Sequence, residues 1–197
     1  MTEFKSISKT FGNKKVISDF SLTLGDGEKI ALMGESGCGK TTLLNIAANL
    51  LTPDSGSFSH SGKGIAYMFQ EPRLLSWHSA RENILAVLPG GKSDKKRHTA
   101  AEHYLRLTGL YDCADTLPDS LSGGMKQRLS YARFLAYAGM CGSDLLLLDE
   151  PFSSIDAENK SRMSELLKSE AKDKTVIYVT HNISDATDFC DKIITLK

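Results

Sequence analysis

The stretch Gly34–Thr42 reads GESGCGKTT and contains the pattern G-x-x-x-x-G-K-[ST]. Its small residues allow backbone N–H groups to curl around the phosphates of a nucleotide. Lys40 would place a cation near the outer phosphates, and the Thr41 hydroxyl can bind Mg²⁺. The apolar segment Lys29–Met33 before it predicts a strand, and a helix starting at about Gly39 would point its positive end at the phosphates. This strand and helix disfavour the alternative of a glycine-rich turn before a core helix, so the stretch predicts a phosphate-binding loop.

Composition limits what else the chain can be. It has 197 residues, of which 41% are hydrophobic, and 24 basic residues balance 24 acidic ones. This size suits one domain with a substantial core, and the zero net charge gives no reason to expect nucleic acid as a partner. No apolar run approaches the roughly 18 residues of a membrane span, and the N-terminus lacks the apolar core of a signal peptide. The four cysteines have no metal-ligand spacing, so we expect a soluble, cytoplasmic protein with reduced thiols.

The hydrophobic pattern along the chain predicts an α/β fold. Alternation over Phe20–Leu24 indicates a half-buried strand, and apolar spacing over Lys40–Leu51 predicts a helix that ends before Pro53. Helical patterns dominate from Glu71 to about Met140. Further buried strands are predicted at Gly64–Phe69, Leu145–Leu148, Thr175–Thr180 and Lys192–Leu196. Continuous apolar strands that alternate with helices indicate a mostly parallel sheet covered on both faces, with the helical middle as an inserted subdomain.

Two acidic residues end one of these strands. Leu145–Pro151 reads LLLLDEP, which places carboxylates at the carboxyl edge of the sheet, where ligands of open α/β folds bind. Asp149 can hold Mg²⁺, and Glu150 is a candidate to orient or deprotonate an attacking water. An acidic pair after a strand can also be a helix cap, but the phosphate loop on the same sheet favours the functional interpretation. Farther along, Asp156 is predicted to be the N-cap of the next helix.

A second anion site is predicted from Leu121–Arg128, which reads LSGGMKQR. Ser-Gly-Gly before an amphipathic helix combines exposed N–H groups, a hydroxyl donor and a helix N-terminus. Ser122 can also serve as an ordinary N-cap. The two roles are compatible, because both use the same unsatisfied amides.

These motifs together resemble those of an ATP-binding cassette ATPase. The phosphate loop, the signature LSGGMKQR, the strand LLLLDEP and the segment FSSID at Phe152–Asp156 occur in the order typical of that family. A glutamine after a strand, Gln70 in MFQEP, and a histidine after the last interior strand, His181 in VTHN, complete the pattern over essentially the whole chain.

The resemblance implies a P-loop NTPase core with a mostly parallel sheet, an N-terminal antiparallel β portion and an inserted helical subdomain. It implies a single domain over 1–197, with 1–70 and 141–197 as the ATP-binding core and about 71–140 as the helical subdomain that carries the signature. The implied cofactors are ATP and Mg²⁺. The implied nucleotide-binding residues are Phe11, Val16, Gly34, Glu35, Ser36, Gly37, Cys38, Gly39, Lys40, Thr41, Thr42, Ser122, Gly123, Gly124 and Met125.

Family roles carry over to individual positions. By the resemblance, Phe11 stacks on adenine, Glu150 is the general base, and His181 contacts the γ-phosphate. Gln70 reaches Mg²⁺ and the water, and Asp156 faces the phosphate loop of a partner subunit. The metal-binding residues would be Thr41, Gln70 and Asp149. Simpler interpretations remain for three of these side chains: a core residue for Phe11, a surface loop residue for Gln70 and a helix cap for His181.

The resemblance also implies partners. One phosphate loop and one signature make half of each composite site, so a second ATPase subunit, most simply an identical one, would complete two sites. A separate transmembrane permease subunit would hold the pair at the cytoplasmic face of the cell membrane. The segment Met68–Ile84, with LLSW followed by REN, is similar to the nitrate, sulfonate and taurine importer subgroup. There Leu74, Leu75 and Trp77 would offer an apolar edge to a helix of the permease, and the alternative for Trp77 is a core residue.

Two other functions are compatible with parts of this pattern. A soluble cassette protein could use ATP as a switch on nucleic acid or ribosomes, but such proteins usually carry a coiled-coil insertion, a tandem cassette or a basic face. A small-molecule kinase would not need the signature. The sequence departs from the family pattern in two places. The segment from Arg133 to Asp149 is longer than usual, which leaves open where its helix ends. The stretch after His181 is short, so we expect no C-terminal regulatory domain.

Overall fold

The computed structural model describes residues 1–196, which form two compact units. The first unit contains 1–67, 144–150 and 173–196, and the second contains 68–143 and 151–172. The helical segment 151–172, which follows the acidic strand, therefore belongs to the same unit as the inserted middle of the chain. The functional division into an ATP-binding core and a helical subdomain stays a prediction.

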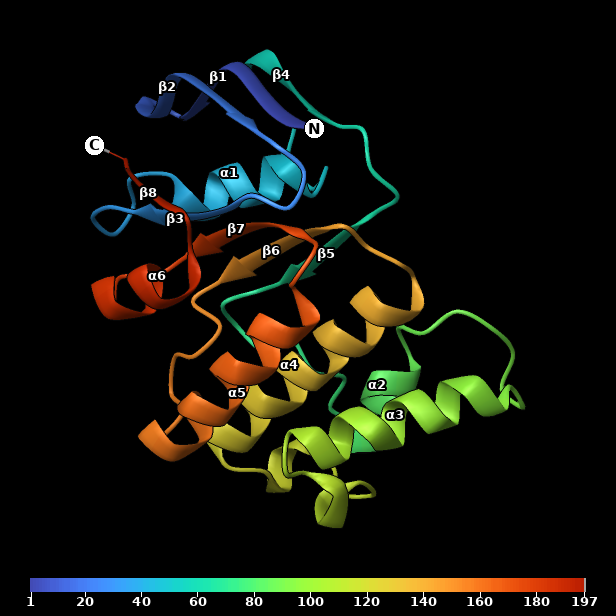
Figure 1. Cartoon of the computed structure of the whole chain (residues 1–197). Helices are drawn as coiled ribbons and strands as arrows, with labels where there is room; N and C mark the ends of the chain where they lie inside the picture. Colours follow the sequence, from blue (N-terminus) through green and yellow to red (C-terminus); the bar gives the residue numbers. More distant parts are fainter. Residues whose placement is uncertain (197) are drawn as a thin grey trace. The chain divides into compact units, whose positions relative to one another are not determined.

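An antiparallel sheet opens the first unit (Figure 1). Its strand order is β2-β1-β4, with bounds Thr2–Phe11 for β1, Lys14–Leu24 for β2 and Ser55–His60 for β4. Bulges interrupt the register of β1 with both of its neighbours. This sheet confirms the N-terminal antiparallel β portion.

The second sheet of this unit confirms the expected parallel arrangement. Its strand order is β5-β6-β7-β3-β8. Strand β3 is parallel to both of its neighbours, β7 and β8, and β6 is parallel to β7. The five strands are β3 Lys29–Met33, β5 Ile65–Met68, β6 Leu145–Asp149, β7 Thr175–Val179 and β8 Lys192–Thr195. Every residue of β6 and β7 is buried, as continuous apolar strands in a parallel sheet require.

Helix α1, Lys40–Ala47, lies between the two sheets, and α6, Ile183–Phe189, covers the other face of the parallel sheet (Figure 1). Leu43 and Leu44 of α1 are fully buried in one apolar cluster with Phe4 from the antiparallel sheet and Leu147 from the parallel sheet. Burial of each large aliphatic side chain contributes about 1.5–3 kcal/mol, so this cluster fixes the position of α1 between the sheets.

The predicted end of α1 was wrong. The apolar spacing extends to Leu51, but the helix ends at Ala47, and Leu50 is 60% exposed. Asn49 adopts a left-handed backbone with φ 56°, and its N–H donates to Ile46 O while Leu50 N–H donates to Asn45 O. This is a Schellman motif, in which the left-handed residue satisfies the last carbonyls and stops the helix.

Helices make up the second unit. They are α2 Ala80–Leu85, α3 Lys95–Leu107, α4 Gly123–Met140 and α5 Ala157–Glu170, with short 3₁₀ turns at Tyr111–Cys113 and Pro118–Ser120. The predicted N-caps are confirmed, because the side chain of Ser122 accepts from Met125 N–H and that of Asp156 accepts from Asn159 N–H. Helix α4 runs to Met140, which settles where the helix of the long segment ends.

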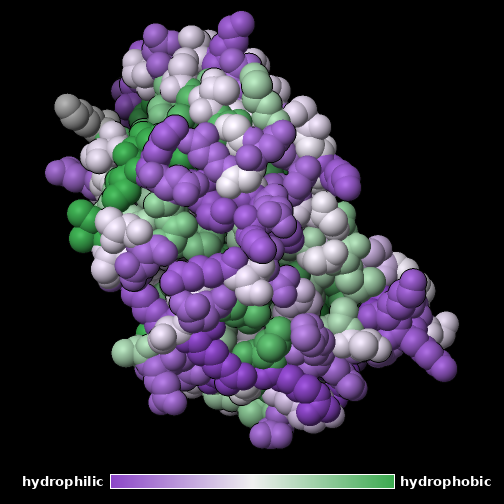
Figure 2. Space-filling model, viewed as in Figure 1, coloured by the Kyte–Doolittle hydropathy of each residue, from purple (hydrophilic) through white to green (hydrophobic). Residues whose placement is uncertain are grey.

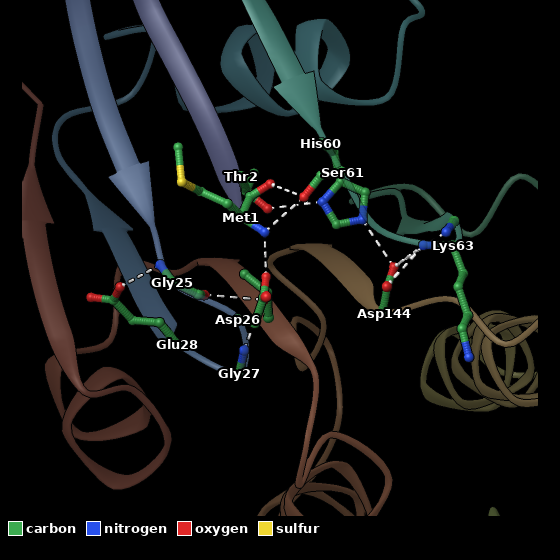
Figure 3. A network of polar contacts seen from close by, with 12 residues as sticks. Met1, Thr2, Gly25, Asp26, Gly27, Glu28, His60, Ser61, Lys63 and Asp144 are labelled. Atoms are coloured by element: carbon green, nitrogen blue, oxygen red, sulfur yellow. Dashed lines mark hydrogen bonds and ion pairs between the residues drawn. The ribbon is translucent and has the colours of Figure 1, made fainter.

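A polar network in the first unit fastens β1 and β4 to the start of β6 (Figure 3). His60 Nε2 lies 2.9 Å from Asp144 Oδ1, and its Nδ1 lies 2.9 Å from Thr2 Oγ1. The same carboxylate accepts the backbone N–H groups of Lys63 and Gly64. His60, to which the sequence assigned no role, therefore joins the two sheets.

Hydrophilic residues predominate on the face shown in Figure 2, and hydrophobic residues form small separate areas there. No helix within residues 1–196 is long and apolar enough to cross a membrane.

Candidate nucleotide-binding site

The loop between β3 and α1 has the backbone of a phosphate cradle. Gly34, Gly37 and Gly39 have φ values of 148°, 79° and 103°. A Cβ on Gly34 would lie 2.6 Å from Leu196 O and 2.7 Å from Cys38 Sγ, so the loop could not close over any larger residue. Glycine is therefore required at this position both for conformation and for space.

Helix α1 is distinguished by its uncapped N-terminus. Gly39 is its N-cap and offers no side chain, and no acidic residue lies in the first turn. Helices α2 to α6 each have a side-chain N-cap: Ser79, Asp94, Ser122, Asp156 and Asn182. Within residues 1–196, α1 is thus the α-helix whose first N–H groups lack a side-chain acceptor, which leaves them and the helix dipole for an anion.

Lys40 lies against the loop that it follows. Its ammonium donates to the carbonyl oxygens of Gly34 and Glu35, both at 2.8 Å, and lies 3.7 Å from Cys38 Sγ. The lysine therefore holds the loop closed through its backbone and places a positive charge inside the cradle. The sequence placed this cation near phosphates but did not predict its bonds to the loop.

A hydrogen bond joins the phosphate loop to the acidic strand. Thr41 Oγ1 donates to Asp149 Oδ2 at 2.7 Å, and Asp149 is only 1% exposed. Burial raises the pKa of this carboxyl, while the Thr41 hydroxyl and the Lys40 charge oppose the shift. The pair thus brings a carboxylate oxygen to the hydroxyl of Thr41, the residue that follows Lys40 in the chain.

Glu150 and His181 form a second pair at the same edge of the sheet. His181 Nδ1 lies 2.7 Å from Glu150 Oε2, and the glutamate side chain is 14% exposed while that of the histidine is 79% exposed. Glu150 has a left-handed backbone with φ 50°, and its N–H donates to Val179 O at the end of β7. Asn182, not His181, caps α6, so the helix-cap interpretation of His181 was wrong.

The hairpin that carries Phe11 and Val16 belongs to the same unit. Phe11 is 48% exposed, which excludes the core interpretation and leaves its ring accessible. Val16 is partly buried, and its Cγ1 would lie 3.2 Å from a Cβ on Gly39, so it packs beside the loop. Glu35, Ser36 and Gly37 are exposed at the loop surface, while Cys38 and Thr42 are partly buried.

The remaining predicted site residues belong to the second unit. Gln70 is exposed just after β5, Ser122 and Gly123 are exposed at the start of α4, and Gly124 and Met125 are partly buried there. Asp156 is exposed, and Asn159 donates to its carboxylate. The first unit thus brings together Lys40, Thr41, Asp149, Glu150 and His181, whereas the signature residues and Gln70 form a separate set.

The ABC transporter family model matches residues 17–153. The chain belongs to the ABC transporter family. It is an ABC ATPase, as the motifs predicted, and its fold class is confirmed by solved cassettes. The dimeric ATP-binding cassette MJ0796, in a post-hydrolysis state bound to ADP and Pi, is similar with a TM-score of 0.89 and 29% identity, and the match covers 100% of this chain and 94% of that one.

Curated relatives of this ABC ATPase match over nearly its whole length. The aliphatic sulfonates import ATP-binding protein SsuB of Zymomonas mobilis is 37% identical, over 99% of this chain and 81% of the relative. The nitrate import ATP-binding protein NrtD of Synechococcus elongatus is 36% identical, over 97% of this chain and 74% of the relative.

The oxygen donors of this ABC ATPase fit Mg²⁺. Thr41 and Asp149 offer a hydroxyl and a carboxylate oxygen 2.7 Å apart, beside a loop built for phosphates. Mg²⁺ in such sites is held by one or two protein oxygens together with phosphate oxygens, so these two side chains suffice as its protein ligands.

Proposed function

We propose that this ABC ATPase drives an importer for a small solute, as the subunit that binds and hydrolyses ATP·Mg²⁺. The observation that carries the proposal is the convergence of Lys40, the Thr41–Asp149 pair and the Glu150–His181 pair at one edge of a single sheet. Two relatives are named as import ATP-binding proteins, one for aliphatic sulfonates and one for nitrate, and these names support import as the direction of transport.

Each group in this arrangement has a role suited to phosphoryl transfer to water. The loop amides, the N-terminus of α1 and Lys40 bind the phosphates and neutralise their charge. Glu150 accepts a proton from the attacking water, and His181, bonded to it at 2.7 Å, orients that carboxylate and contacts the γ-phosphate. Mg²⁺ held by Thr41 and Asp149, with Gln70 as a further ligand, would add charge neutralisation at the phosphates.

A second copy of the chain completes the site. Ser122 accepts from Met125 N–H through Oγ and keeps its own O–H to donate, so it can cap α4 and bind a phosphate at once. With Gly123 and Gly124 it would contact ATP bound by the partner copy, and Asp156 would face the phosphate loop of that copy. ATP then stabilises the closed pair, and hydrolysis removes the γ-phosphate contacts. The dimeric state of the solved cassette supports this arrangement.

The loop between β5 and α2 supports docking to a permease. Trp77 is 71% exposed, although large aromatic side chains usually bury their area. Asn83, which is fully buried, accepts from Leu75 N–H and donates to the carbonyls of Leu75, His78 and Ser79. The buried Asn83 thus holds the loop backbone while the tryptophan of the loop stays exposed, as a docking surface requires.

Arg133 fixes the other end of this loop. Its guanidinium donates to the carbonyl oxygens of Pro72 and Arg73 at 2.6 and 2.9 Å. A permease bound at this loop would hold the ATPase at the cytoplasmic face of the cell membrane.

The test of the hydrolytic role is Glu150→Gln, which keeps the shape of the side chain and removes the base. Loss of a general base costs on the order of a hundredfold or more in rate. We expect steady-state ATP turnover to fall by at least that factor while ATP still promotes dimerisation, measured by light scattering. Glu165→Gln, at an exposed glutamate of α5, is the matched control. Turnover near the wild-type rate in Glu150→Gln would refute the role of Glu150.

Import is tested separately by purification from native membranes. A co-purifying multi-span permease that stimulates ATP turnover, and whose association is lost in Trp77→Ser, supports the proposal. Co-purification with ribosomes or DNA in its place would favour the soluble ATP switch.

A further inference from the structure

One face of helix α4 contacts the segment 151–154, which directly follows Glu150 in the chain. Gly124, Gln127 and Tyr131 are spaced i, i+3 and i+7, so they share one side of the helix. All three contacts lie within the second unit, and the segment they touch begins at the peptide that joins Glu150 to Pro151.

Gln127 makes the most specific of these contacts. Its side chain is 2% exposed, and Nε2 donates to Pro151 O at 3.2 Å. A buried amide is costly without a partner, and proline has no N–H, so this carbonyl is the one backbone polar group that Pro151 offers. A glutamine at this position therefore fixes the backbone immediately after Glu150.

The neighbours of Gln127 on this face hold the rest of the segment. The ring of Tyr131 lies 5.9 Å from that of Phe152, and the Tyr131 hydroxyl donates to Met163 O at 2.9 Å. A Cβ on Gly124 would lie 3.1 Å from Ser154 O, so the helix approaches this carbonyl closely. The segment is thus contacted at three of its residues, Pro151, Phe152 and Ser154.

The backbone at both ends of the segment needs such support. Glu150 and Ser154 have φ values of 50° and 65°, a left-handed conformation that is unfavourable for residues other than glycine. Such a backbone persists only where the surroundings impose it. Val179 O accepts the N–H of Glu150 on one side, and Gln127 holds the carbonyl of Pro151 on the other.

We propose that Gln127 is a positioning residue for ATP hydrolysis: its bond to the Pro151 carbonyl sets the backbone from which the Glu150 carboxylate reaches the attacking water. The inference rests on the proposed role of Glu150 as the base. It also assigns a second task to α4, because the helix that begins with the signature residues holds the peptide that follows the base.

The test compares Gln127→Met, which has nearly the same shape but no donor, with Tyr137→Phe, which removes a hydroxyl from another face of α4. A displacement of a catalytic group by about 1 Å can cost about a hundredfold in rate, so a displacement of about half that size costs on the order of tenfold. We expect kcat for ATP to fall by about that factor in Gln127→Met, with KM for ATP and ATP-dependent dimerisation unchanged, and no change in kcat for Tyr137→Phe. Gln127→Leu, which also lacks a donor, gives the same result and serves if the methionine variant does not fold.

The decisive measurement is the double-mutant cycle with Glu150→Gln, read from single-turnover rates at excess protein. Once the base is absent its position no longer matters, so Gln127→Met should not lower the residual rate further. A wild-type kcat in Gln127→Met, or the same tenfold loss in both backgrounds, would overturn the inference and leave the proposed function intact. An active Glu150→Gln protein would instead refute the base role itself, and the inference with it.

Discussion

Replacement of Thr41 by valine would separate the structural and metal-binding roles of the phosphate loop. The two side chains have nearly the same shape, but valine cannot donate to Asp149 Oδ2, which lies 2.7 Å from the threonine hydroxyl. Hydrogen bonds to charged groups contribute about 1.5–3 kcal/mol, and because Thr41 itself is exposed, we take about 2 kcal/mol as the loss. For a chain of this length that corresponds to a decrease in Tm of about 4–8 °C without nucleotide.

This destabilisation should depend on pH in a definite direction. Burial raises the pKa of Asp149 above its ordinary 3.8, so folding favours the protonated carboxyl. The stability that this carboxyl contributes is therefore greatest below pH 3.8. That contribution is lost as the pH rises through the pKa of the folded state. The Thr41 hydroxyl opposes this shift by stabilising the ionised form. The difference in free energy of unfolding between wild type and Thr41→Val should therefore be largest at neutral pH and smaller in acid.

The assay is thermal unfolding followed by circular dichroism, with and without ATP·Mg²⁺. Thr41→Ser keeps the hydroxyl and should retain most of the stability, and Thr42→Val, one residue along, controls for valine in the first turn of α1. If Thr41 also binds the metal, Thr41→Val should lose the Mg²⁺-dependent part of the stabilisation by ATP. A nucleotide-free Tm within about 1 °C of wild type for Thr41→Val would refute the assigned energy of the bond.

Two further predictions concern the first unit. Burial of Asp144 would raise its pKa, but the N–H groups of Lys63 and Gly64 and the ring of His60 together lower it to about 2, so its stabilisation is complete above the ordinary 3.8 and is lost as pH falls toward 2. Asp144→Asn should have a lower free energy of unfolding than wild type at neutral pH. Between pH 3.8 and about pH 2, its free energy of unfolding should change less than that of wild type. Parallel curves of unfolding free energy against pH for the two proteins would contradict the assignment. Phe11→Ala should leave Tm unchanged, because the ring is 48% exposed, but weaken ATP binding on the order of tenfold by calorimetry, whereas Phe11→Tyr should bind normally. Equal affinity in all three proteins would exclude stacking on Phe11.

Features set by a few neighbouring residues could be predicted from the sequence. The bounds of β3 and the N-caps Ser122 and Asp156 follow from apolar runs and capping chemistry, which act within one turn or strand. The end of α1 could not be predicted from periodicity. Leu50 continues the apolar spacing but lies beyond the left-handed Asn49, and a local backbone preference for asparagine there overrides the pattern.

Some contacts between distant segments had no signal in the sequence. His60 and Asp144 lie 84 residues apart, and neither belongs to a recognisable motif, so their pairing depends wholly on how β4 and β6 are brought together. The bonds of Lys40 to the loop carbonyls were missed for another reason. They use backbone acceptors, which every residue has, so no side-chain pattern can reveal them.

The order of strands in the sheet explains why these residues form one site. β7 lies between β3 and β6, so the phosphate loop and the acidic pair follow strands about 10 Å apart. Direct contact between them requires the chain after β3 to pass over the end of β7, and the Thr41–Asp149 bond shows that the first turn of α1 does so. The residues that follow β7, Thr180 and His181, must then leave this path free. His181 does this by remaining largely exposed while its ring turns to Glu150, so its ring stays accessible for the contact with the γ-phosphate that we propose.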